Sequence, residues 1–111
     1  MNFELNEEQK MIQKVVRDFA EKELKPIAGE LDESGRFPKE ILSKMGEMGL
    51  FGLPFSEEYG GSGAGYLSYA IAVEEIARAC ASTGITYAAH CSIGTGPIYL
   101  FGTEEQKKKW V

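Results

Sequence analysis

Cysteine, histidine and basic side chains are all scarce in this sequence. It has 2 cysteines and 1 histidine, too few for a disulfide scaffold or a metal cluster. Cys80 and Cys91 form no C-x-x-C pair and no cluster with the histidine, so we expect both to be reduced, buried thiols. With 12 Lys and Arg against 17 Asp and Glu, the net charge is −5. Because an acidic chain repels phosphate backbones, nucleic-acid binding is a poor hypothesis.

Targeting and membrane-spanning segments are also missing. The N-terminus has no basic region followed by an apolar run, so it resembles neither a secretory signal nor a transit peptide. Residues 79–103 carry no Asp, Glu, Lys or Arg, but serine, threonine, glycine and proline are spread through them. This composition leaves no run of about 20 apolar residues, which a membrane-spanning helix requires. We therefore expect a cytoplasmic protein without a membrane span.

Strand patterns are nearly absent, whereas helical spacing of apolar residues recurs along the chain. No longer segment alternates polar and apolar side chains with enrichment in β-branched residues. Apolar residues instead recur three and four positions apart, as at Ile12, Val15, Val16 and Phe19. The 111 residues suffice for one domain. The sequence therefore predicts a single all-α domain over residues 1–111, a bundle of about five to six helices.

Capping residues and a proline mark the first helix. Asn6 and Gln9 form a capping box at its start. Pro26 must break or kink this helix, because the proline ring clashes with the carbonyl four residues earlier. The helical spacing resumes after the proline and is expected to end at Ser34-Gly35.

Two further helices are expected on either side of a glycine-rich loop. Pro38 suits the first position of the next helix, which should stop at Gly49. The loop, residues 50–65, is too apolar for a free linker, so we expect it to be ordered and pinned by its aromatic side chains; a flexible hinge is the alternative. A helix over 66–80 follows, with Glu74 and Glu75 on its solvated edge.

The last third of the chain contains several predicted helix boundaries. Ser82 is expected to cap a helix to about residue 92, and residues 94–97 (Gly-Thr-Gly-Pro) are expected to interrupt it. A short helix then begins at Pro97 and stops at Gly102. Thr103 and Gln106 form a second capping box, which begins the last helix.

The sequence offers no catalytic or metal-binding constellation. His90 and Cys91 are neighbours, but consecutive residues of a helix point about 100° apart, so we expect no Cys–His dyad. Residues 60–65 resemble a phosphate cradle, yet no strand precedes them and no lysine follows. We therefore assign no catalytic, cofactor-binding or metal-binding residue.

Two features suggest that these residues belong to something larger. The uncharged stretch 79–103 should be hidden on nearly all sides, whereas each helix of a small bundle normally keeps a solvated face. The helix that begins at Thr103 reaches Trp110 and Val111, where the sequence stops. We expect the 111 residues to be an N-terminal piece of a longer chain, prone to oligomerise when isolated.

A series of short motifs runs along the whole chain. In order, they are Phe-Ala-Glu-Lys-Glu-Leu-Lys-Pro-Ile-Ala (19–28), Gly-Arg-Phe-Pro (35–38), Met-Gly-Glu-Met-Gly-Leu-Phe-Gly-Leu (45–53), Glu-Glu-Tyr-Gly-Gly-Ser-Gly (57–63), Glu-Glu-Ile-Ala-Arg (74–78) and Gly-Thr-Glu-Glu-Gln-Lys-Lys-Lys-Trp (102–110). Each is weak alone, but the ordered set resembles the N-terminal helical domain of acyl-CoA dehydrogenases.

The resemblance implies a subunit of an FAD-dependent enzyme that removes hydrogens from Cα and Cβ of an acyl-CoA thioester. In that family a glutamate base takes the α proton, FAD accepts the β hydride, and electrons leave to an electron-transferring flavoprotein. A middle β domain and a C-terminal helical domain carry FAD and the base there, and both are absent from this sequence. The resemblance also implies a homo-oligomer, a tetramer in the family. We expect these residues alone to hold no FAD and to be inactive.

The resemblance further implies a wall of the acyl-binding pocket. In the family, the helix before the Gly-Pro break lies along the fatty-acyl chain, and the matching substrate-binding positions here are Ile85, Thr86, Ala89 and Ile93. The small Ala89 should leave the groove open. The alternative for these four residues is ordinary helix–helix core. Two other functions remain open: a stand-alone helical interaction module without flavin, and an acyl-CoA oxidase that passes electrons to oxygen.

Overall fold

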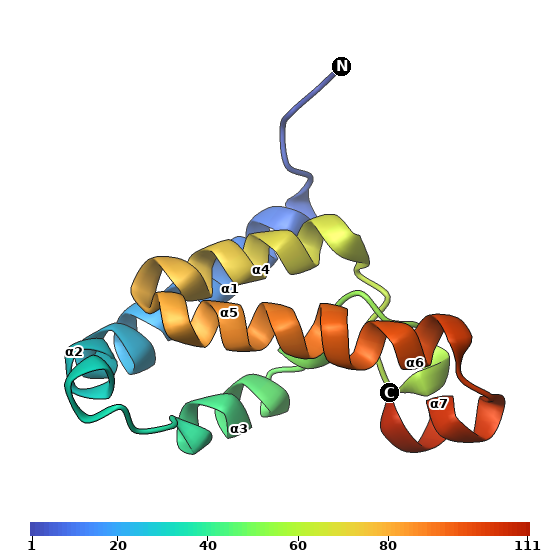
Figure 1. Cartoon of the computed structure of the whole chain (residues 1–111). Coiled ribbons are helices and arrows are strands. Elements are labelled where there is room, and N and C mark those ends of the chain that lie inside the picture. Colours follow the sequence, from blue (N-terminus) through green and yellow to red (C-terminus); the bar gives the residue numbers. More distant parts are fainter.

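The computed structural model covers residues 1–111 and consists of helices joined by short connections (Figure 1). Its helical segments form five rods. The first contains α1 (Glu7–Phe19), the π-helical turn η1 (Ala20–Leu24) and α2 (Lys25–Ser34), and the next two are α3 (Lys39–Glu47) and α4 (Gly65–Ala79). The fourth contains α5 (Ala81–Ala89), the π-helical turn η4 (His90–Thr95) and α6 (Gly96–Phe101), and the last is α7 (Glu104–Trp110). The predicted all-α fold is therefore confirmed.

The first rod passes Pro26 without a break. The predicted capping box is present, with the Gln9 amide donating to the Asn6 side chain over 2.8 Å and the Asn6 amide donating to the Gln9 side chain over 2.9 Å. Before the proline the helix widens, and the Lys25 amide donates to the Ala20 carbonyl five residues back. Of the predicted break or kink, the break does not occur: the widened turn η1 accommodates the proline, because it moves the preceding carbonyls away from the proline ring. The rod ends as predicted, where Gly35 has a φ of 69°.

The core lies between the neighbouring helices α1 and α4 and includes buried side chains of the 50–65 loop. Its side chains come from nearly every element: Val16, Ala20, Leu24, Leu31, Ile41, Met45, Leu50, Leu53, Phe55, Ala72, Ile76, Tyr87 and Cys91. Burying one large apolar side chain of this kind stabilises the fold by about 1.5–3 kcal/mol.

The core also contains a charge that the sequence analysis placed wrongly. Glu75 is only 2% exposed, not on a solvated helix edge. Arg17 of α1 donates to both of its carboxylate oxygens, over 3.0 and 2.8 Å, and Arg78 lies 3.7 Å away. A carboxylate is tolerated at such a position because it is paired and hydrogen-bonded. The pair of the half-exposed Arg17 and the buried Glu75 therefore joins α1 to α4.

The 50–65 loop is ordered, as predicted. It contains two short 3₁₀ turns, η2 (Leu50–Gly52) and η3 (Glu57–Tyr59), and the buried ring of Phe55 pins it to the core. Gly61 passes so close to its neighbours that a Cβ there would lie 2.2 Å from the Phe55 carbonyl oxygen. Only glycine permits this approach.

The fourth rod is continuous, and residues 94–97 do not interrupt it. As in the first rod, a widened turn precedes the proline: the Gly96 amide donates to the Cys91 carbonyl five residues back, and Pro97 lies in the first turn of α6. Cys80, rather than Ser82, occupies the position before α5. Pro38 likewise precedes α3 by one residue, whereas Gly49 and Gly102 end their helices as predicted. No helix has both the length and the apolar content needed to cross a bilayer.

Candidate functional site

The residues predicted to bind an acyl chain lie along one side of the fourth rod. The opposite side of α5 packs on α4, where a Cβ on Gly84 would lie 2.5 Å from the Cβ of Ala77. This close approach turns Ile85 and Ile93 outward, with exposed fractions of 67% and 76%. Ala89 between them is half-buried. We call Ile85, Ala89 and Ile93 the exposed stripe. Both isoleucines are therefore outside the core of this domain.

The widened turn η4 keeps the exposed stripe straight. In a regular α-helix two turns take about 7.2 residues, so residues eight apart, such as Ile85 and Ile93, drift out of line. A π-helical turn takes up an additional residue, because its hydrogen bonds reach five rather than four residues back. Ile93 lies within η4 and is thereby rotated back toward the line of Ile85 and Ala89.

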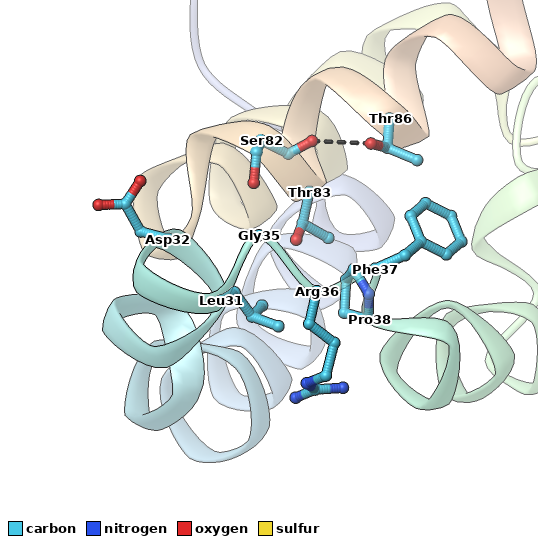
Figure 2. A pocket seen from close by; sticks show the side chains of 9 residues that line it. All are labelled: Leu31, Asp32, Gly35, Arg36, Phe37, Pro38, Ser82, Thr83 and Thr86. Carbon is cyan, nitrogen blue, oxygen red and sulfur yellow. Dashed lines mark hydrogen bonds between the residues drawn. The ribbon is translucent and has the colours of Figure 1, made fainter.

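Thr86 lies at the edge of the exposed stripe and lines a separate hollow of about 330 Å³ (Figure 2). The hollow lies where the α2–α3 connection meets the start of α5. Its lining combines polar and apolar side chains and consists of Leu31, Asp32, Gly35, Arg36, Phe37, Pro38, Ser82, Thr83 and Thr86. The Thr86 hydroxyl donates to the Ser82 carbonyl over 2.8 Å, so its proton is already engaged. Of the four predicted site residues, only Thr86 reaches this hollow.

The one cation of that hollow is held by its own neighbours. Arg36 donates to Glu30 over 2.9 Å and to Glu40 over 2.7 Å. Hydrogen bonding to both carboxylates raises the pKa of Arg36, and Arg36 in turn lowers the pKa of Glu30 and of Glu40. With its charge balanced in this way, Arg36 is poorly suited to bind an anionic ligand.

His90 and Cys91 do not form a catalytic pair. The Cys91 thiol faces the Phe51 carbonyl at 3.5 Å, whereas the His90 ring packs edge-on against the Phe51 ring, with centroids 4.8 Å apart. Burial raises the pKa of the Cys91 thiol to about 11, so it stays protonated and unreactive at neutral pH. The two side chains thus have different partners.

Cys80 differs from the expectation, because it is only half-buried. Burial alone would raise the pKa of the Cys80 thiol, but hydrogen bonds from Ser82 and Thr83 outweigh it and lower that pKa. Both cysteines are free thiols, and no group of three or more metal-ligating side chains comes together in the structure.

In the glycine-rich loop, the amides of residues 60–64 are not free to bind a phosphate. The amides of residues 60–64 donate to the carbonyls of Glu57, Ser56, Gly52, Phe55 and Leu53, over 2.8–3.0 Å. A phosphate cradle requires such amides to point at the ligand. Residues 60–65 therefore resemble a phosphate cradle in composition but not in structure.

Sequence reasoning missed the features that shape the exposed stripe. The glycine and proline at 96–97 suggested a helix break. A widened turn also relieves the clash between the proline ring and the preceding carbonyl. Tyr69, whose hydroxyl donates to the Ala88 carbonyl, was not considered, since nothing in its sequence context marks it.

Comparisons with known proteins agree with one another. Residues 6–111 match the family model described as acyl-CoA dehydrogenase, N-terminal domain. A probable acyl-CoA dehydrogenase of Bacillus subtilis is 57% identical over 108 residues, which are 97% of this chain and 28% of that protein. The chain thus spans little more than a quarter of the length of this curated relative.

Solved structures give the same result. The butyryl-CoA dehydrogenase of Megasphaera elsdenii superimposes with a TM-score of 0.93 at 42% identity, covering 99% of this chain and 30% of that one. An acyl-CoA dehydrogenase of Bacillus anthracis, solved in complex with FAD, superimposes with a TM-score of 0.88 at 42% identity, covering 96% of this chain and 19% of that one.

Proposed function

The chain belongs to the acyl-CoA dehydrogenase family as its N-terminal domain, and on that premise we propose that it forms one wall of the acyl pocket of an FAD-dependent acyl-CoA dehydrogenase. The proposed reaction of the complete protein is α,β-dehydrogenation of an acyl-CoA thioester. Ile85, Thr86, Ala89 and Ile93 contribute binding to this reaction, and no residue of this chain transfers the proton or the hydride.

The observation that carries the proposal is an apolar stripe on an uncharged, outward-facing helix. Ile85 and Ile93 expose most of their surface, and the small side chain of Ala89 lies between them. An acyl chain laid there gains about 0.8 kcal/mol for each buried methylene group. The lack of charge favours such a ligand, because an ionised side chain would have to be desolvated beside it.

FAD does not fit a site made from these residues alone. The glycine-rich loop is the only candidate cradle in the sequence, and its amides at 60–64 are already hydrogen-bonded within the loop. We therefore place FAD on the remaining domains of the same protein, in keeping with the relative solved with FAD. The proposal extends to a homo-oligomeric enzyme that passes its electrons to an electron-transferring flavoprotein.

A larger side chain at Ala89 tests directly whether the exposed stripe forms a wall of the acyl pocket. In the full-length enzyme, Ala89→Leu is expected to lower kcat/KM for acyl-CoA about 10-fold or more, because three additional carbons occupy the space of the acyl chain. The rate is measured by reduction of an electron acceptor across a series of acyl-CoA chain lengths. Ala70→Leu, on the exposed side of α4, is the matched control and should leave kcat/KM unchanged.

Two outcomes would contradict the proposal at different levels. Equal kcat/KM for Ala89→Leu and Ala70→Leu at every chain length would remove Ala89 from the acyl pocket. A full-length protein that binds FAD yet oxidises no acyl-CoA would overturn the proposed reaction itself.

A further inference from the structure

We infer that Tyr69 of α4 is a positioning residue for the exposed stripe: its hydroxyl holds the Ala88 carbonyl at the start of the widened turn η4 and so sets the direction of Ile93. The inference rests on the proposed function, because the stripe matters to catalysis only if an acyl chain lies along it. Tyr69 itself lies in the neighbouring helix and is not part of the exposed stripe.

The Ala88 carbonyl receives two side-chain hydroxyls. Tyr69 donates to it over 2.8 Å from α4, and Ser92 donates to it over 2.7 Å from within η4. Ala88 is the last residue but one of α5, so this oxygen lies where the regular helix gives way to the wider turn. Two hydroxyls on one carbonyl satisfy it independently of the backbone amide that a regular α-helix would direct at it.

The Tyr69 side chain is a rigid anchor for this contact. Its ring packs edge-on against Tyr87, with centroids 5.6 Å apart and an interplanar angle of 90°. Tyr87 is fully buried and donates to the Leu50 carbonyl over 2.7 Å. Tyr87 belongs to α5, so the ring contact and the hydrogen bond to Ala88 together fix Tyr69 against the fourth rod just before η4.

Loss of the Tyr69 hydroxyl should therefore loosen the widened turn. A π-helical turn competes with the regular α-helical alternative, in which residues after Ala88 return to a spacing of 3.6 per turn. That return would rotate Ile93 away from the line of Ile85 and Ala89. The acyl chain would then lose contact at one end of the stripe, while the reacting carbons, bound elsewhere, would be unaffected.

The test is Tyr69→Phe in the full-length enzyme, which keeps the ring and removes only the hydroxyl. We expect hydrogen exchange of the amides at 90–96 to accelerate about 3- to 10-fold, the range set by one lost hydrogen bond. We expect KM for an acyl-CoA that spans the stripe to rise by a similar factor with kcat within about twofold, the mark of lost ground-state binding. Ser92→Ala removes the other donor and should act in the same direction.

Tyr59→Phe is the matched control, because the Tyr59 hydroxyl donates to Glu104 at the start of α7 and to no group of α5 or η4. It should change neither the exchange at 90–96 nor KM. Unchanged exchange in Tyr69→Phe would overturn the inference, and so would faster exchange with an unchanged KM in an active enzyme. If the wild-type enzyme oxidises no acyl-CoA, the proposed function fails, and with it the role of Tyr69 in substrate binding. The hydrogen-exchange data still test separately whether the Tyr69 hydroxyl stabilises the widened turn.

Discussion

The two widened turns, η1 in the first rod and η4 in the fourth, arise from the same steric conflict but have different surroundings. Each ends two residues before a proline, Pro26 in one case and Pro97 in the other. A proline inside a helix lacks its amide hydrogen and clashes with the carbonyl four residues back. Each rod answers with a hydrogen bond that reaches five residues back and then continues as an α-helix.

The residues around the two turns differ: η1 contributes side chains to the core, whereas η4 contributes a side chain to the surface. In η1, Ala20 and Leu24 are buried in the core, and the residues between them are charged. In η4, no residue is charged and Ile93 is exposed, while the preceding Ala88 carbonyl is tied by hydroxyls from Tyr69 and Ser92. A proline thus determines where a helix widens, whereas the tertiary contacts determine what the widened turn is used for.

Truncation of a buried side chain in each turn should give the largest difference. Leu24→Ala in η1 is expected to lower the free energy of unfolding by about 2–5 kcal/mol, because Leu24 is wholly buried and leaves a cavity. Cys91→Ala in η4 removes a single sulfur atom and should cost about 1 kcal/mol. Urea unfolding followed by circular dichroism measures both, and equal losses would remove the distinction between the two turns.

Features that depend on neighbouring residues could be predicted from the sequence, whereas features that depend on tertiary contacts could not. The capping boxes at Asn6 and Thr103 and the stop at Gly35 were predicted correctly, because each depends on a few adjacent residues. The widened turns were not, since proline at Pro26 or Pro97 is compatible with a break, a kink or a π-helical turn, and packing against other elements selects among them.

The buried position of Glu75 and the role of Tyr69 lay outside sequence reasoning for a related reason. Glu75 is separated from Arg17 by 58 residues, and Tyr69 from Ala88 by 19. A local pattern shows a glutamate on a helix edge or a tyrosine among apolar residues, but the partner appears only when two helices pack. Four substrate-binding positions were nevertheless proposed from the motif order, and they share one side of one rod.

Charge is the second way to separate the two turns. The Arg17–Glu75 pair and Arg78, which lies 3.8 Å from Glu21, surround η1, whereas no charged residue lies within η4. The hydrogen bonds from Arg17 lower the pKa of Glu75. Glu75→Gln should therefore cost about 1–2 kcal/mol at pH 7, a moderate loss because the half-exposed Arg17 regains water.

The pH dependence of that loss has a definite sign. A carboxylate whose pKa is lower in the folded state stabilises the fold above its unfolded pKa of about 4.3, and this stabilisation disappears as the pH falls through the lower folded value. The stability difference between Glu75→Gln and the wild type should thus begin to shrink below about pH 4 and disappear once the pH is below the folded pKa of Glu75, as urea midpoints over a pH series will show. A constant difference across the series would contradict the assignment of the effect to the ion pair.

Replacement of each proline should have the smallest effect on the free energy of unfolding. It also tests most directly whether η1 and η4 differ in function. An alanine at 97 can donate its amide to the Ile93 carbonyl and an alanine at 26 to that of Lys22, so each variant permits the regular helix, with a net change within about 1 kcal/mol. The two should nevertheless differ in function. Pro97→Ala is expected to raise KM for acyl-CoA about 3-fold or more, because it changes the direction of Ile93 in the exposed stripe. Pro26→Ala acts at η1, which contributes no residue to the exposed stripe, and should leave KM unchanged. Steady-state kinetics on the full-length enzyme measure both. Equal KM values for the two variants would mean that the widened turn η4 has no part in substrate binding. The two turns would then differ only in the residues that surround them.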